Sequence, residues 1–181
     1  MMRFLIKRAI EVSAARSGTD ADYMLALYSA SPKAVRGMAK VSALLAHREA
    51  VPVEAAFAAQ LTGALEEGCG SCVQIHIAMA RKAGVEDALI EAILTRDLDF
   101  LPPDVALAAS FALAISRRSA DEVESREGVR ARWGDRGVVD LVIATQLSRF
   151  LTMFKAGFGH ATTCGPLQIG DRTIYAHGRG A

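Results

Sequence analysis

Apolar residues recur every three or four positions along most of this chain, which is the spacing of one face of an α-helix. The alternation of apolar and polar residues that is typical of a half-buried strand does not appear before residue 162. The segments with helical spacing are rich in alanine and cover residues 3–17, 20–29, 32–47, 52–67, 70–83, 86–95, 103–118, 121–132 and 136–157. The pattern therefore predicts an all-α fold.

The breaks between these segments carry residues that begin or end helices. Ser31-Pro32 combines a side chain that can cap a helix with a proline that suits the first helical position. Pro102-Pro103 marks a second start, and Gly84 and Gly134 are placed where helices end. Both the spacing and the punctuation indicate a bundle of short and medium helices.

Chain length and composition indicate a single domain. The chain has 181 residues, 51% of them hydrophobic, which is enough to form one core. Residues 162–181 differ in character, because Gly165-Pro166 and Gly170-Asp171 interrupt them. We expect a helical domain over residues 1–161 and an extended arm or loop over residues 162–181.

Charge and cysteine content narrow the possible partners and compartment. The formal net charge is +1 and the basic residues are scattered, so a nucleic-acid partner is not expected. Lys7-Arg8 follow the apolar residues 4–6 at once, and uncharged stretches such as 105–116 are shorter than the roughly 20 residues that cross a bilayer. Three cysteines do not form a paired secretory framework. We expect a cytoplasmic protein with no membrane partner.

One short motif concentrates the candidate chemistry. It reads Cys69-Gly70-Ser71-Cys72-Val73-Gln74-Ile75-His76. On a helix, Cys69, Cys72 and His76 lie on one face that also carries apolar residues, whereas Ser71 and Gln74 are expected on other faces. Cys69 falls in or near the first turn, where unpaired backbone N–H groups and the helix dipole favour a thiolate. The thiols should face the interior or a pocket, and at least one should be more acidic than a free cysteine.

Several uses of this motif compete. Attachment of c-type haem needs histidine directly after the second cysteine, where Val73 stands. A zinc site would need more ligands, which Cys164, His160 or a glutamate would have to supply, since no second half-site is present. Buried cysteines can also simply fill a core. Thiol–disulfide or peroxide chemistry, which needs no cofactor and no metal, is the interpretation we favour.

The motif and its surroundings resemble the carboxymuconolactone decarboxylase and alkylhydroperoxidase D-like superfamily over about residues 50–160. The residues that carry the resemblance are Cys69-x-x-Cys72-x-x-x-His76, Gly84-Val85, Leu101-Pro102, the helix 105–116 and Trp133-Gly134-Asp135 before 138–141. This resemblance implies an all-helical subunit that forms homo-oligomers, with the active site near the cysteine helix. Because both cysteines are present, it points to the hydroperoxide-reducing branch.

In that branch the resemblance implies that Cys72 attacks the peroxide, Cys69 resolves the product and His76 relays protons. Its partners would be a hydroperoxide substrate and a dithiol or protein reductant. The family also places a glutamate on the preceding helix, at a position that Phe57 occupies here. Glu54 and Glu66 are the candidates to replace it, although charges near helix ends are expected to be exposed.

Two other functions stay open at this point. A lyase acting on a cyclic lactone acid would need a cluster of arginine or histidine side chains, which the sequence does not show in one place. A non-catalytic oligomeric helical protein with a structural or redox-sensing disulfide would need only Cys69 and Cys72.

Overall fold

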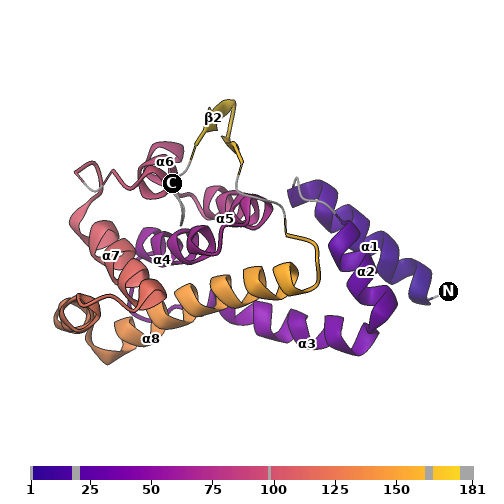
Figure 1. The fold of residues 1–181 in the computed structure, drawn as a ribbon, viewed down its shortest axis with the longest axis horizontal. Helices are drawn as coiled ribbons and strands as arrows, with labels where there is room; N and C mark the ends of the chain where they lie inside the picture. Colours follow the sequence, from indigo (N-terminus) through magenta and orange to yellow (C-terminus); the bar gives the residue numbers. More distant parts are fainter. Residues whose placement is uncertain (1, 18–20, 98, 162–164, 176–181) are drawn as a thin grey trace.

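The computed structural model describes residues 2–17, 21–97, 99–161 and 165–175. Over these residues the chain is a mostly helical single domain with eight α-helices and a minor β-hairpin (Figure 1). The elements are α1 (Met2–Ser17), α2 (Asp22–Ala30), α3 (Pro32–Ala43), the 3-10 helix η1 (Leu44–Ala46), α4 (Val53–Glu66), α5 (Gly70–Lys82), α6 (Asp87–Thr95), α7 (Pro103–Arg117), α8 (Glu122–Gly157), β1 (Leu167–Ile169) and β2 (Arg172–Ile174).

The predicted helix starts and breaks have clear physical causes in the structure. The Ser31 side chain accepts a hydrogen bond of 3.1 Å from the backbone N–H of Ala34 at the start of α3. Arg96 and Arg118 adopt left-handed backbone conformations after α6 and α7. Gly134 has φ of 70° and interrupts α8, so this element consists of two helical stretches, as the sequence predicted.

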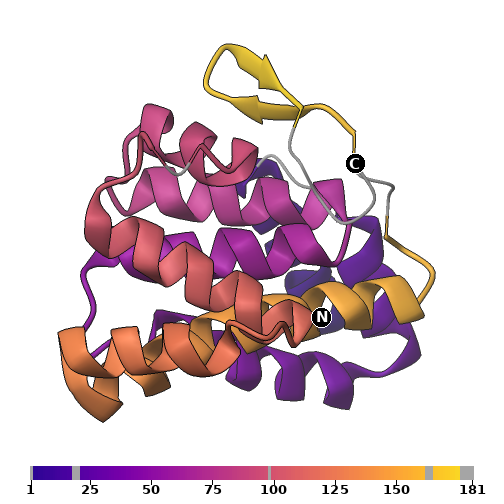
Figure 2. The ribbon, with the colours of Figure 1, turned by 60° about the vertical axis from the view of Figure 1, so that its left-hand side comes forward.

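Helix α4 forms the centre of the bundle. Every residue from Ala55 to Glu66 is buried, and α4 packs against α5, α6, α7 and α8 (Figures 1 and 2). Its small side chains allow close approach: a Cβ atom at Gly63 would lie 2.5 Å from Ser148 Oγ and 2.7 Å from the Thr145 carbonyl oxygen. The alanine-rich sequence of α4 therefore sets how near α8 lies to the core.

Helix α8 is long and apolar enough, over an 18-residue window, to cross a membrane by length and composition alone. Core helices of soluble domains meet the same criterion. Two of its charged residues are satisfied inside the bundle. Asp140 accepts backbone hydrogen bonds from Glu49, Ala50 and Val51, and Arg149 donates to Glu67 at 2.7 Å. Helix α8 packs on α4 and α7 in this structure.

The C-terminal segment, expected as an extended arm or loop, contains an antiparallel hairpin where the structure describes it. Leu167 and Ile169 on β1 and Ile174 on β2 are buried and join the core of the same chain. The Gln74 side-chain amide fastens β1 to α5: its Nε2 donates to the Gln168 carbonyl oxygen at 2.8 Å, and its Oε1 accepts the Gln168 backbone N–H at 2.9 Å. Cys164 lies outside the described residues.

Candidate functional site

The two cysteines of the motif form a disulfide at the start of α5. Cys69 is the N-cap residue, and its carbonyl oxygen accepts the backbone N–H groups of Cys72 at 3.0 Å and Val73 at 3.1 Å. The cysteine Cα atoms are 5.3 Å apart, the spacing of one helical turn. Both side chains are buried, with 1% of Cys69 and 6% of Cys72 exposed. The first turn of α5 thus holds a redox-capable pair away from bulk water.

His76 lies one turn beyond Cys72, and its hydrogen bonding assigns a role to each ring nitrogen. The Gln60 amide nitrogen donates to the Leu45 carbonyl oxygen at 3.1 Å, which directs the Gln60 Oε1 atom toward His76 Nδ1 at 3.3 Å. Because Oε1 can only accept, Nδ1 carries the proton and Nε2 keeps its lone pair. Complete burial lowers the pKa of His76 to about 4, so the ring is neutral near pH 7.

Cys72 and His76 open onto an apolar cavity of about 380 Å³. Its lining comes from α1, α2, α3 and η1 on the one hand and from α5 and α8 on the other; Figure 1 shows where these elements lie. Cys69 is not among its lining residues, so Cys72 is the member of the disulfide that lines the cavity. The lining residues are Ile10, Ala14, Tyr23, Met24, Met38, Ala39, Ser42, Leu45, Cys72, Ile75, His76, Met79, Leu151, Thr152 and Lys155.

A buried lysine of α8, which also lines this cavity, reaches the start of the motif. Lys155 is 7% exposed, and its ammonium donates a hydrogen bond of 2.8 Å to Ser71 Oγ. Ser71 Oγ in turn lies 3.4 Å from Cys69 Sγ. The expectation that Ser71 points away from the cysteines is wrong, because α8 brings Lys155 against the start of α5. Tyr23 covers the same ammonium, which lies 5.8 Å from the ring centroid, and burial raises the pKa of this phenol.

The structure separates the two candidate glutamates from the cavity. Glu66 is only 2% exposed and forms ion pairs with Arg96 and with Arg117, the latter at 2.8 Å, so the expectation of an exposed side chain at this helix end is wrong. Glu54 is half-buried in the first turn of α4. Neither belongs to the cavity lining, and Phe57 is part of the hydrophobic core. Gln60, one turn after Phe57, is the α4 residue that contacts His76.

Sequence reasoning missed three polar residues of this site: Gln60, Ser71 and Lys155. The sequence carries a signal for two of them. Gln60 is the polar residue within the apolar stretch 55–61, and Lys155 directly follows residues 152–154, two of which are apolar. A polar side chain on the buried face of a helix needs a partner. That partner could not be named without the fold.

Metal ligation finds little support in the part of the chain that the structure describes. No group of three or more His, Cys, Asp or Glu side chains is close enough there to hold a metal ion. Cys164, which the zinc alternative would use, lies outside these residues, and His160 stacks on Phe158 with ring centroids 5.4 Å apart.

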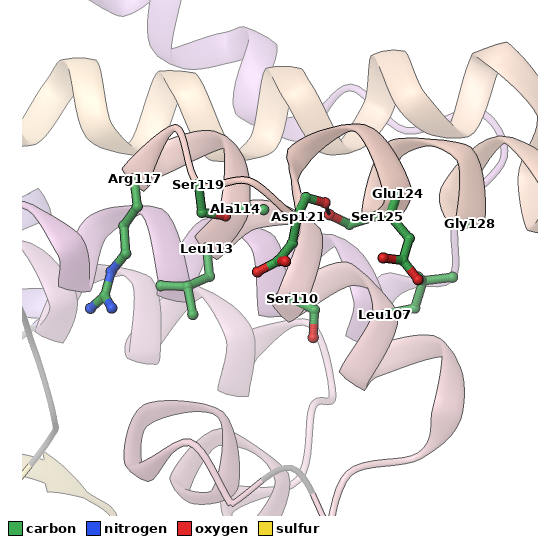
Figure 3. A pocket seen from close by; sticks show the side chains of 10 residues that line it. All are labelled: Leu107, Ser110, Leu113, Ala114, Arg117, Ser119, Asp121, Glu124, Ser125 and Gly128. Atoms are coloured by element: carbon green, nitrogen blue, oxygen red, sulfur yellow. Dashed lines mark hydrogen bonds between the residues drawn. The ribbon is translucent and has the colours of Figure 1, made fainter.

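A larger hollow of about 530 Å³ lies between α7 and the first part of α8 (Figure 3). Arg117 stands at one end, with its guanidinium paired to Glu66, and Glu124 stands near the other. None of the residues that line it is a cysteine or histidine, so this hollow is separate from the Cys-x-x-Cys motif. The lining residues are Leu107, Ser110, Leu113, Ala114, Arg117, Ser119, Asp121, Glu124, Ser125 and Gly128.

Fold and site together define a mostly helical single-domain protein with a buried Cys-x-x-Cys disulfide at the start of a helix, consistent with thiol redox chemistry. Comparison with known proteins found no matching family model, no matching curated protein and no matching solved structure.

Proposed function

We propose that this protein is a thiol-dependent oxidoreductase that reduces organic hydroperoxides through a dithiol–disulfide cycle of Cys69 and Cys72. One observation carries the proposal: the Cys72 member of a buried disulfide faces an apolar cavity together with a neutral imidazole. The resemblance of the motif to the alkylhydroperoxidase D-like superfamily supports the same chemistry.

In the oxidising half of the cycle, the Cys72 sulfur attacks the terminal oxygen of the hydroperoxide while His76 Nε2 accepts the thiol proton, and the O–O bond breaks. Cys72 becomes a sulfenic acid, and the alkoxide takes the proton back from His76 and leaves as an alcohol. Gln60 supports this step by holding the proton on Nδ1, which keeps Nε2 available as the base.

In the second half, the Cys69 thiolate attacks the Cys72 sulfur, the sulfenic oxygen leaves as water after protonation, and the disulfide forms. A dithiol or a protein reductant then supplies two electrons and returns both cysteines to the reduced state. Such a reductant is abundant in a cytoplasmic setting, which we propose for this protein.

Apolar side chains form most of the cavity wall, including Met24, Leu45, Ile75 and Leu151. This surface favours an organic hydroperoxide over hydrogen peroxide, because only the organic substrate has apolar area to bury. The lyase alternative is not favoured, since the wall offers Lys155 and His76 rather than a cluster of arginines for carboxylates.

The test is the consumption of cumene hydroperoxide with dithiothreitol as reductant. Cys72→Ser should abolish turnover, whereas Cys164→Ser should retain it, and Cys69→Ser should accumulate a sulfenic acid on Cys72 that a dimedone probe traps. Free thiols counted before and after peroxide should disappear and return with dithiothreitol. Undiminished turnover of Cys72→Ser would refute the proposal, and thiols that never react would favour a structural disulfide.

A further inference from the structure

We propose that Lys155, acting through Ser71, stabilises negative charge on the Cys69 sulfur, so that Cys69 is the thiolate that leaves when the disulfide opens and attacks when it closes. Lys155 and Ser71 are positioning residues in this scheme. The inference rests on the proposed dithiol–disulfide cycle, but it does not depend on the identity of the oxidant.

The hydrogen-bond chain has a defined direction. Cys69 carries no hydrogen on its sulfur while it is in the disulfide, so in the 3.4 Å contact the Ser71 hydroxyl must be the donor. The Ser71 oxygen in turn accepts from the Lys155 ammonium at 2.8 Å. Each link points its hydrogen toward the Cys69 sulfur, and a charged donor at the far end polarises the chain further.

The position of the lysine makes its charge effective at the sulfur. Two links of 2.8 and 3.4 Å place the ammonium within about 6 Å of Cys69 Sγ, a range in which an opposite charge shifts the titration of a group by about 1–3 pH units. Burial of Lys155 and both cysteines limits screening by water. The first turn of α5 adds its own positive end, on which Cys69 is the N-cap residue.

Three titratable groups close to this chain, Glu67, His76 and Tyr23, do not oppose the effect of Lys155. Glu67, two residues before Cys69, is engaged by Arg149 at 2.7 Å. Burial keeps His76 neutral and raises the pKa of the Tyr23 phenol, so neither adds a competing charge near pH 7.

The two sulfurs therefore receive different support. A dithiol that enters the cavity meets Cys72, and its thiolate attacks the Cys72 sulfur. The Cys69–Cys72 bond breaks, its electron pair stays on Cys69, and a mixed disulfide forms between Cys72 and the reductant. The second thiol of the reductant then attacks the reductant sulfur that is bonded to Cys72. This step releases reduced Cys72 and leaves the reductant as a disulfide. Lys155 and Ser71 stabilise the Cys69 thiolate that the first step creates.

The direct test is the titration of Cys69 alone. The Cys72→Ser, Cys164→Ser background leaves Cys69 as the one remaining cysteine, and its thiolate is followed by ultraviolet absorbance as the pH is raised. We expect the midpoint to lie below the ordinary value of about 8.5. Adding Lys155→Met should raise it by at least about one pH unit, with a smaller rise for Ser71→Ala. Lys155→Arg keeps the charge and should restore most of the difference.

The double variant Arg149→Met, Glu67→Gln is the matched control, because it removes a half-buried cation of the same helix together with the carboxylate it engages, without touching the Ser71 link. It should leave the Cys69 midpoint unchanged. A midpoint that does not move in Lys155→Met, or that moves equally in the double variant, would overturn the inference. Should Lys155→Met fail to fold, Ser71→Ala breaks the same chain with a smaller change and decides the matter.

A second measurement uses the chain with all its cysteines. Dithiothreitol should reduce the disulfide of Lys155→Met about threefold more slowly, since a less acidic thiol is a poorer leaving group. This outcome is independent of hydroperoxide consumption. A shifted titration in a protein that consumes no hydroperoxide would refute the proposed function and leave the role of Lys155 standing, whereas the reverse result would refute only the role of Lys155.

Discussion

Burial of His76 as a neutral base should make the protein lose stability in mild acid. The folded state holds the pKa of His76 at about 4, below its ordinary value of 6.5, because burial penalises the charged ring. Between these two values the unfolded chain binds a proton that the folded chain does not. The free energy of unfolding must therefore fall as the pH falls from about 6.5 toward 4.

The size of this loss follows from the same two values. At about 1.4 kcal/mol per pH unit, the full difference is worth about 3 kcal/mol once both states are protonated, and about 2 kcal/mol of it should be lost between pH 7.5 and 5. For a domain whose total stability is about 5–15 kcal/mol, one side chain would then account for a large fraction of it. Burial of the neutral ring thus lowers the free energy of unfolding in acid by a measurable amount.

Urea unfolding of the oxidised protein from pH 7.5 to 5 measures this dependence, with His76→Gln as the comparison. Glutamine does not titrate, and its amide can still donate to Gln60. The other ionisable groups are common to both proteins, so the difference in unfolding free energy isolates His76. We expect that difference to shift by about 2 kcal/mol in favour of the variant as the pH is lowered. A difference that stays constant with pH would show that His76 is not held neutral by burial.

Two further predictions concern the support of this site. Gln60→Leu should destabilise the protein by about 1–3 kcal/mol and slow hydroperoxide consumption, because it leaves the buried His76 Nδ1–H without its acceptor, whereas Gln60→Glu should raise the pKa of His76 and narrow the acid-sensitive window. Thermal unfolding and the urea titration measure both effects. Gly63→Ala should cost about 1–3 kcal/mol, because its Cβ would meet Ser148 and the Thr145 backbone, while the control Gly37→Ala in the open should be neutral or stabilising by up to about 1 kcal/mol. Equal unfolding midpoints for the two alanine variants would contradict the close packing of α4 on α8.

The features that the sequence predicted are those set by neighbouring residues along the chain. Helical spacing of alanine and other apolar residues placed the helices, and Gly134 marked the break in α8 because its φ of 70° suits glycine. The same periodicity placed Cys72 and His76 on the side of α5 that lines the cavity, whereas Cys69 precedes the helix as its N-cap residue. Local geometry is enough for these inferences, since positions three and four apart on a helix always lie together.

The features that the sequence left undetermined depend on contacts between distant segments. Gln60 meets His76 across 16 residues, and Lys155 meets Ser71 across 84. The helical spacing predicted that Ser71 points away from the cysteines. In the structure its hydroxyl, in the first turn of α5, contacts both Cys69 and Lys155. Only the fold, which brings Lys155 of α8 within hydrogen-bond distance of Ser71, creates that link.

Glu66 and the C-terminal hairpin show the same limit. A glutamate at a helix end is usually solvated, but the partners of Glu66, Arg96 and Arg117, stand 30 and 51 residues further along. The strands of the hairpin have three residues each, which is too short for alternation to be recognised. Their burial comes from docking on α5 and α6, a contact that the sequence pattern does not encode.

The two cysteines stand three residues apart at the start of α5, Cys69 as its N-cap residue and Cys72 in its first turn. Polar side chains on other helices distinguish them further: Gln60 of α4 fixes the base beyond Cys72, and Lys155 of α8 supports Cys69 through Ser71. A base that titrates near pH 4 does not hold the Cys72 proton at rest and serves only during attack on the peroxide. A cation suits Cys69, whose charge must persist while the disulfide opens and closes. Under the proposed cycle, loss of Gln60 should therefore slow oxidation of the dithiol, whereas loss of Lys155 should slow the exchange steps of the disulfide.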